Sequence, residues 1–357
     1  MITQASGNLL DAQVDALVNT VNTVGVMGKG IALQFRRAYP AMYREYTKAA
    51  KAGGIRLGQM HVWTNDEALT GPRYIINFPT KGHWKAPSRL TDIEAGLADL
   101  ARVVHHLGIT SIAVPPLGCG NGGLDWAQVR PLIERTFAAL PDVDARVYPP
   151  AGAPQAADMR NHTRQPRWTV GKAALVDLIA RYGERTLDVS IIEVQKLMYF
   201  LQEAGEPLRL DYQKGRYGPY ADNLQKVLQA VEGHFLTGYG DGSLPVASAE
   251  PIAPLADAPA QAADFLKDHP DTLARSQRVL GLAGGYESPY AMELLSTVHW
   301  VATHAPQPAA DDDAAARAVT AWSPRKATLF TPAHVHAAWD HLADHGWLPA
   351  GGTAPLS

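Results

Sequence analysis

Two glycine-rich segments have the residue types that bind an anion. Each follows an apolar, strand-like run and precedes a helical pattern; the first spans residues 19–32 and the second spans residues 113–126. The second has four glycines within the six residues 118–123. Glycines let backbone N–H groups approach an anion closely, and a helix N-terminus favours negative charge. Either segment alone is equally compatible with a tight turn, but the pair predicts two loops that grip a diphosphate.

A lysine and two aromatic residues follow a third strand-like run. The segment is Asn-Phe-Pro-Thr-Lys-Gly-His-Trp, with the lysine at Lys81 and the aromatic residues at His83 and Trp84. A single lysine in a loop is most often a solvated surface residue. On its own, therefore, Lys81 predicts no chemistry, and its interest depends on the segment around it.

Strand-like and helical patterns alternate through the first half of the chain. Short apolar runs bounded by turn residues predict buried strands over residues 15–19, 60–64, 74–78, 111–115 and 144–148. Helical patterns lie between them, over residues 31–51, 90–107 and 126–140. Thr91 and Glu94 have the spacing of a capping box. This alternation is typical of a layered α/β domain, which would bring the strand ends and their loops together.

The two glycine-rich segments, with Ser6-Gly7-Asn8-Leu9, resemble the macrodomain family, which binds ADP-ribose. The resemblance implies a three-layer α/β/α fold with a mixed sheet. It also implies that the loops wrap the diphosphate, that Asn22 contacts the distal ribose and that Asn8 lies at the adenine. The residues it places in the ADP-ribose site are Asn8, Leu9, Asn22, Gly28, Lys29, Gly30, Ile31, Thr80, Gly118, Cys119, Gly120, Asn121, Gly122, Gly123 and Leu124.

The segment around Lys81 is similar to that of the lysine-bearing macrodomain hydrolases. This group includes the human terminal ADP-ribose glycohydrolase and the DarG-type antitoxins, which remove the ADP-ribose that a DarT toxin attaches to a DNA base. The resemblance implies that Lys81 is the catalytic residue and that the substrate is ADP-ribosylated single-stranded DNA, with thymidine as the expected base. His83 and Trp84 are candidates for stacking on that base, although Trp84 is equally compatible with internal packing.

An amine suits this reaction. Cleavage of an N-glycosidic bond builds oxocarbenium character on the distal ribose, and a neutral amine can trap that carbon covalently. Burial, together with Lys85 and Arg89, would lower the pKa of Lys81 and favour the neutral form. A lysine that only stabilises charge remains an alternative. The human relative pairs its lysine with an aspartate where this chain has Gly122, and Asp125 is expected to cap the next helix, so no general acid is assigned.

The second half of the chain predicts a helical domain. Prolines punctuate residues 149–167, and a linker over residues 156–167 separates residues 1–155, the expected macrodomain, from residues 168–357. The amphipathic run over residues 194–205, followed by the turn-like residues 214–220, resembles the helical domain of toxin-neutralising antitoxins, which implies that residues 168–357 bind a cognate DarT-like ADP-ribosyltransferase toxin. Helical patterns cover residues 170–182, 191–204, 220–235, 260–268, 291–304 and 334–345, and an exposed loop is expected over residues 244–259.

Charge and cysteine content narrow the possible partners and compartment. Residues 1–155 carry a net charge of +3, which suits a phosphate backbone, whereas residues 156–357 carry −6, which suits a basic protein. Cys119 is the only cysteine, so a disulfide framework and a cysteine-based zinc site are excluded. Neither a signal-peptide pattern nor an apolar run of membrane-spanning length is evident, so we expect a cytoplasmic protein without a membrane partner.

Other functions and a metal site were weighed against this interpretation. His341 and His345 would share a helix face, but no third ligand with suitable spacing is evident, so neither a metal nor an organic cofactor is expected. One alternative is a hydrolase that acts on ADP-ribosylated protein or on small ADP-ribose esters. Another is a non-catalytic ADP-ribose reader fused to a regulator, since the helix before residues 346–348 resembles a winged-helix ending. Lys81 distinguishes a hydrolase from a reader.

Overall fold

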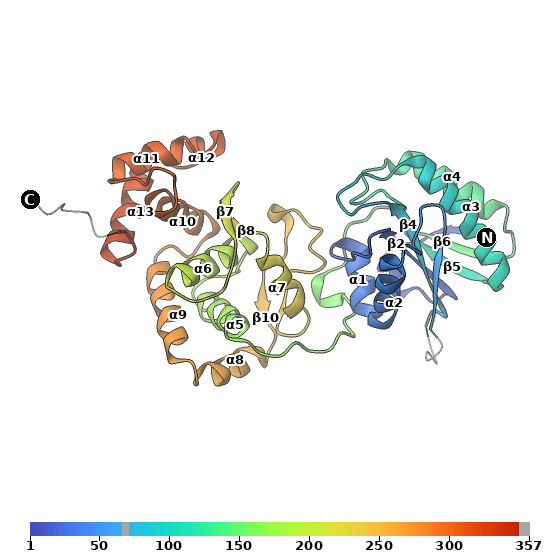
Figure 1. Cartoon of the computed structure of the whole chain (residues 1–357), viewed down its shortest axis with the longest axis horizontal. Helices are drawn as coiled ribbons and strands as arrows, with labels where there is room; N and C mark the ends of the chain where they lie inside the picture. Colours follow the sequence, from blue (N-terminus) through green and yellow to red (C-terminus); the bar gives the residue numbers. More distant parts are fainter. Residues whose placement is uncertain (66–70, 350–357) are drawn as a thin grey trace, which may run out of the picture. The chain divides into compact units, whose positions relative to one another are not determined.

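The protein consists of two units, seen in a computed structural model that describes residues 1–65 and 71–349 (Figure 1). The first unit contains Met1–Arg164 and a short segment from far along the chain, Gly240–Leu244. The second contains Gln165–Tyr239 and continues from Pro245. Residues 156–164, expected in a linker, thus belong to the first unit. Among the described residues, no helix is long and apolar enough to cross a membrane.

The first unit is built on a six-stranded mixed sheet. Its strands are β1 (Ile2–Gln4), β2 (Ala16–Asn22), β3 (His61–Thr64), β4 (Tyr74–Lys81), β5 (Ser111–Val114) and β6 (Asp144–Val147). Their spatial order is β1-β6-β5-β2-β4-β3, and only β3 pairs antiparallel within this sheet. Five of the strands match the predicted runs. The sequence analysis missed β1 because it is only three residues long and exposes two of them.

Helices cover both faces of the sheet, as the predicted three-layer fold requires (Figure 1). They are α1 (Gly30–Ala38), α2 (Pro40–Lys51), α3 (Leu90–Leu107) and α4 (Trp126–Ala138). Alternate residues of the strands enter two separate cores. Leu17 and Ile75 pack with residues of α1 and α2, whereas Val18 and Ile76 pack with residues of α3 and α4. This alternation follows from the two-residue period of a strand.

Two predictions about helix boundaries in this unit were wrong. The helix expected over residues 31–51 is divided into α1 and α2 at Tyr39, whose backbone leaves the helical region (φ −130°, ψ 71°). Tyr39 precedes Pro40, and the proline ring disfavours helical geometry at the residue before it. The helix predicted over residues 90–107 has these bounds, but the capping box of Thr91 and Glu94 does not form, because the N-cap is Arg89, two residues before Thr91, and it makes no side-chain cap bond.

The second unit is mainly helical, as predicted, and has its own core. Residues 193–201 of α6 and 292–299 of α10 are buried without interruption, so these helices form its interior. No helical pattern was predicted over α9 or α12. The helices are α5 (Val170–Gly183), α6 (Ile191–Glu203), α7 (Leu224–Val231), α8 (Ala258–Leu266), α9 (Pro270–Ala283), α10 (Pro289–Thr303), α11 (Asp312–Thr320), α12 (Pro324–Leu329) and α13 (Pro332–Asp344).

A short hairpin replaces part of the helix expected over residues 220–235. Strands β7 (Tyr212–Gly215) and β8 (Gly218–Ala221) pair antiparallel, and α7 begins only at Leu224. A second antiparallel pair joins β9 (Leu236–Thr237) to β10 (Ala253–Pro254). Of these two strands, β10 lies within the loop expected over residues 244–259. Strand pairing, which depends on contacts between separate segments, is what shows these two pairs.

Buried charged groups hold the base of the β7–β8 hairpin. Lys196 is fully buried and its Nζ donates to the Pro219 carbonyl at 2.5 Å. Lys326 donates to Glu293 at 2.6 Å and to the Thr297 hydroxyl at 3.0 Å. Burial, aided by the neighbouring Lys326 charge, lowers the pKa of Lys196 to about 7. An amine that is neutral for much of the time is therefore the donor to the hairpin.

Gly96 sets how closely α3 approaches the sheet. A Cβ atom at this position would lie 2.2 Å from Cζ of Phe78 in β4, so we expect Gly96→Ala to lower the free energy of unfolding by about 1–3 kcal/mol. Gly281→Ala in α9 is the matched control, because its added methyl would meet nothing within 4 Å and alanine is the better helix former. Urea unfolding followed by circular dichroism measures both. Equal stability of Gly96→Ala and wild type would contradict this packing.

Candidate active site

The two glycine loops and Lys81 leave the sheet at one edge. β2 lies between β4 and β5 and runs parallel to both. The first loop follows β2, Lys81 ends β4, and the second loop follows β5. The carboxyl ends of adjacent parallel strands form the edge where open α/β sheets bind ligands. The predicted site residues are thus brought together by strand order.

Lys81 connects the loops. It is the last residue of β4 and pairs with Asn22, the last residue of β2, after the register of the two strands shifts by one residue between Val21 and Asn22. Its Nζ donates to the Asn121 carbonyl of the second loop at 2.7 Å, and its own carbonyl accepts from the Thr23 amide of the first loop at 3.1 Å. The lysine amine therefore lies beside the second loop, at the root of the first.

Burial alone lowers the pKa of Lys81. The expected contribution of neighbouring cations is not found, because both are placed differently. Lys85 Nζ lies 4.8 Å from the centre of the Trp84 ring, and the Arg89 guanidinium bonds to Asp92 at 3.0 Å. Partial desolvation of the amine is thus the physical cause that favours its neutral form.

Asn22 shapes the first loop. Its side chain is 5% exposed, its Oδ1 accepts from the amides of Val24 and Val26 at 3.1 and 3.2 Å, and its Nδ2 donates to the Val26 carbonyl at 2.6 Å. The Tyr46 hydroxyl donates to the Asn22 carbonyl from α2. These bonds stabilise the turn that leads to Gly28 and Gly30. The contact of Asn22 with a ribose stays a prediction.

The two loops approach each other at Gly30. This glycine is the first residue of α1, has φ +62°, and would place a Cβ atom 3.3 Å from Nδ2 of Asn121. Lys29 is the N-cap residue but makes no side-chain cap bond. The first turn of α1 therefore lies where the two loops meet. Its N–H groups, including that of Ile31, are in an arrangement that suits an anion.

The second loop has no room for a side chain at Gly122. A Cβ atom there would lie 2.3 Å from the Ser88 hydroxyl and 2.4 Å from the Gly118 carbonyl. The Ser88 amide donates to the Gly122 carbonyl at 2.9 Å, and the Leu124 amide donates to the Gly118 carbonyl at 3.1 Å. An aspartate at position 122 is therefore incompatible with this loop. Asp125 caps α4 as predicted, accepting from the Ala127 amide at 3.0 Å.

The side chains of Cys119 and Thr80 donate hydrogen bonds to the backbone around the site. The Cys119 thiol donates to the Leu117 carbonyl at 3.6 Å, and burial raises its pKa to about 11, so it stays protonated. Thr80 is buried and its hydroxyl donates to the Val21 carbonyl at 3.3 Å. Asn8 caps a short 3₁₀ turn, Leu9–Asp11, by accepting from the Leu10 amide. These side chains support the loops that they belong to.

Trp84 is an exposed aromatic surface. It is 49% exposed, which excludes the alternative that it packs inside the protein. The His83 and Trp84 rings lie 5.3 Å apart at 32°. Both follow Lys81 by two or three residues, and the Thr23 hydroxyl ties Gly82 to the first loop at 2.7 Å. An unstacked base held near the lysine would therefore find an aromatic face close by.

The histidines of the last helix are bonded within the protein. His341 Nε2 lies 2.7 Å from the Leu282 carbonyl, and His345 Nδ1 lies 2.8 Å from the His341 carbonyl. Over residues 1–65 and 71–349, no three His, Cys, Asp or Glu side chains gather into a set that could hold a metal.

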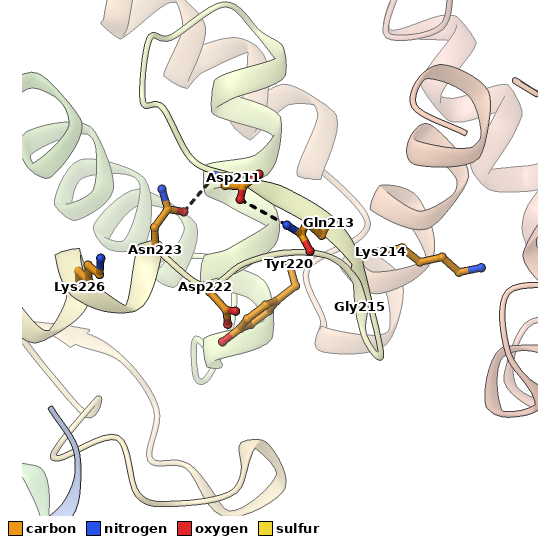
Figure 2. Close-up of a pocket in the computed structure, with 8 residues that line it drawn as sticks. All are labelled: Asp211, Gln213, Lys214, Gly215, Tyr220, Asp222, Asn223 and Lys226. Atoms are coloured by element: carbon orange, nitrogen blue, oxygen red, sulfur yellow. Dashed lines mark hydrogen bonds between the residues drawn. The ribbon is translucent and has the colours of Figure 1, made fainter. Parts of the chain in front are cut away.

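A polar hollow of about 340 Å³ lies beside the β7–β8 hairpin of the second unit. Figure 2 shows Gln213 directed toward Asp211, which it bonds at 3.3 Å, and Asn223 bonded to the Asp211 amide at 3.0 Å. Lys214 points away from the other labelled side chains. The remaining lining residues are Gly215, Tyr220, Asp222 and Lys226. With charges of both signs, this hollow does not indicate one class of ligand.

Known proteins identify the family. Residues 18–133 match the Macro domain model. A DNA ADP-ribosyl glycohydrolase of Mycobacterium tuberculosis is 44% identical over 96% of this chain and 99% of its own length, and one of Thermus aquaticus is 44% identical over 98% and 94%. The chain belongs to the DNA ADP-ribosyl glycohydrolase family. The resemblance to the lysine-bearing macrodomain hydrolases of the DarG type is thereby confirmed.

The similarity extends over both units in these relatives. A solved structure, the macrodomain of Mycobacterium tuberculosis DarG, is 60% identical over 42% of this chain and 99% of its own, with a TM-score of 0.42. A Thermosipho africanus protein, named as a fusion of a DNA ADP-ribosyl transferase and a DNA ADP-ribosyl glycohydrolase, is 33% identical over 40% of each chain. The family assignment rests on the near full-length relatives.

Gly120 tests the position of the diphosphate. A Cβ atom there would meet nothing within 4 Å, and the backbone does not require glycine, so Gly120→Ala should fold and bind ADP-ribose as the wild type does. Gly120→Glu adds a carboxylate where the phosphates are expected, and we predict at least tenfold weaker binding through charge repulsion. Titration calorimetry with ADP-ribose measures both. Equal affinity of the two variants would place the diphosphate elsewhere.

Proposed function

We propose that the first unit hydrolyses the N-glycosidic bond between ADP-ribose and a base of single-stranded DNA, with thymidine as the base. The observation that carries this proposal is the Lys81 amine, 2.7 Å from the second glycine loop and at the root of the first. Two glycine loops that bind the diphosphate would bring the distal ribose toward this amine. A reader of ADP-ribose would not need a partly desolvated lysine there.

The lysine acts as a nucleophile in this mechanism. The lone pair of neutral Nζ attacks the anomeric carbon of the distal ribose as the bond from that carbon to the base nitrogen breaks. The bonding pair leaves with the base nitrogen, which takes up the proton that Nζ loses as its new bond to carbon forms, so the base is released intact in the DNA. Water then attacks the same carbon, one of its protons passes to Nζ as the bond from Nζ to carbon breaks, and ADP-ribose leaves while the neutral amine is regenerated.

The surroundings of Lys81 favour each of these reaction steps. Burial favours the neutral amine before attack. The exposed Trp84 face gives the base a surface to stack on as it departs, and base–aromatic stacking contributes about 1–3 kcal/mol per base. The net charge of +3 on residues 1–155 attracts the phosphate backbone of the strand.

Removal of the amine tests the proposal. Lys81→Ala should abolish release of ADP-ribose from modified single-stranded DNA and leave the affinity for ADP-ribose within about threefold, because the loops that bind the diphosphate are unchanged. Lys81→Arg is the matched control for charge, since a guanidinium stays protonated and cannot attack. Full turnover by Lys81→Ala would refute catalysis by Lys81, and turnover by Lys81→Arg would assign it an electrostatic role instead.

The pH profile tests the neutral amine. Because burial lowers the pKa of Lys81, the rate should rise with pH through that lowered pKa and level off at a lower pH than for an ordinary lysine. Single-turnover rates on modified single-stranded DNA, measured at saturating enzyme, give the profile. A rate that does not fall toward acid pH would contradict a neutral amine nucleophile.

We further propose that the second unit binds and inhibits a DarT-like ADP-ribosyltransferase toxin in the cytoplasm. The net charge of −6 on residues 156–357 complements the cationic groove that a DNA-modifying toxin needs. The Thermosipho africanus fusion protein, whose name joins transferase and glycohydrolase, supports a partnership of the two activities. The single cysteine suits the reducing cytoplasm, where the toxin would meet DNA.

Separate fragments test the division of roles, because each unit has its own hydrophobic core. Residues 165–357 should retain the toxin in a pull-down and inhibit it without hydrolysing modified DNA, and added salt should weaken this binding. Residues 1–164 should remove ADP-ribose from DNA without retaining the toxin. Retention by the first fragment alone, or by neither, would contradict the proposed role of the second unit.

A further inference from the structure

The first unit contains a segment from the second half of the chain, Gly240–Leu244, here called the inserted segment. The residues before and after it belong to the second unit. A Cβ atom at Gly240, which has φ +57°, would lie 3.3 Å from Cε of Met159. The inserted segment thus packs as part of the first unit, although about 75 residues of the second unit precede it in the sequence.

Buried hydrogen bonds attach the inserted segment to one face of α1. The Gly30 amide donates to the Asp241 carbonyl at 3.1 Å, Gln34 Nε2 donates to the Asp241 carboxylate at 2.6 Å, and Arg37 Nη1 donates to the Gly240 carbonyl at 2.8 Å. Asp241 is 2% exposed, Gln34 is 6% and Arg37 is 4%. Residues four and three positions apart share a helix face, so the three donors form one row.

The carboxylate of Asp241 organises the segment as well as the contact. While Oδ2 accepts from Gln34, Oδ1 accepts from the Ser243 amide of the same segment at 2.9 Å. Among the described residues it has no ion pair within 4 Å. A buried carboxylate needs such hydrogen bonds, because leaving its oxygens without partners would cost the full desolvation penalty.

Gly30 connects this contact to the phosphate loops. It is the first residue of α1, it has φ +62°, and its other side faces the Asn121 amide of the second loop. A glycine at this position has many backbone conformations when it is unrestrained. The Asp241 carbonyl accepts a hydrogen bond from the Gly30 N–H. This bond selects one backbone conformation of Gly30, and the next N–H groups of α1 follow from that conformation.

We propose that Asp241 is a positioning residue for ADP-ribose: through the inserted segment it fixes Gly30, and thereby the first phosphate loop, in the conformation that binds the diphosphate. This rests on the ADP-ribose site proposed above. Asp241 does not touch the ligand in this arrangement, and its effect comes from removing the cost of ordering the loop when the ligand binds. The second half of the chain thus contributes to substrate affinity in the first unit.

Asp241→Ala in the full chain tests this role. We expect the Kd for ADP-ribose, from titration calorimetry, to rise about tenfold, and KM for modified single-stranded DNA to rise in parallel, with kcat within about twofold of wild type. Asp241→Asn keeps an oxygen that accepts one of the two bonds, and it should recover part of the affinity. Amide exchange should quicken at the start of α1 in Asp241→Ala.

Leu244→Ala is the matched control in the same segment, because Leu244 is 38% exposed. It should bind as the wild type does. If wild type and Leu244→Ala do not bind ADP-ribose at all, the proposed function fails rather than the role of Asp241. Unchanged Kd and KM in folded Asp241→Ala would overturn that role and leave Asp241 with a structural function only.

Gln34→Ala tests the same hydrogen bond by changing its donor. It replaces Asp241→Ala as the test if that variant does not fold. It removes the donor to the carboxylate while alanine keeps the helix. We expect a weakened Kd here too, and a double variant that is less weakened than the two single effects combined would show the coupling. Unchanged Kd and KM in both Gln34→Ala and Asp241→Asn would overturn the proposal.

Discussion

Parallel pairing between β2 and β4 is the constraint on which the site depends. It places Asn22 opposite Lys81, so that the first glycine loop and the lysine leave the sheet together. The pairing of β2 with β5 then brings the second loop to the other side of the same strand. Before the register shift at Val21 and Asn22, a slip of the β2–β4 pairing by one residue would send alternate strand residues, such as Ile75 and Ile76, into the opposite helix layers. The two cores, which accept alternate strand residues, prevent such a slip.

The site is built mainly from backbone, and that explains its glycines. Gly122 has no space for a side chain beside Ser88, and Gly30 has a left-handed backbone next to Asn121. Backbone N–H groups at a helix start carry no counter-charge of their own and suit a diphosphate. Against this background Lys81 contributes a single partly desolvated amine.

The first unit includes residues that are distant from the rest of it in the sequence. The first unit includes Gly240–Leu244, whose buried Asp241 bonds to α1 beside the phosphate loop. In the second unit, buried Lys196 donates to the base of the β7–β8 hairpin, and buried Lys326 donates to Glu293. In both places an ionisable side chain is buried where its partners are distant in sequence, and its removal would leave those partners unsatisfied.

The sequence by itself determined the α/β alternation, the two glycine loops, Lys81 and the helical second half, because these depend on local periodicity, on glycine chemistry and on a motif of adjacent residues. It also showed the Asp125 cap, which is a local bond. Tertiary structure alone decided that Trp84 is exposed, that burial rather than Lys85 and Arg89 lowers the pKa of Lys81, and that Asp241 reaches α1. Those properties depend on contacts across as many as 207 residues, and no local pattern encodes which distant groups meet.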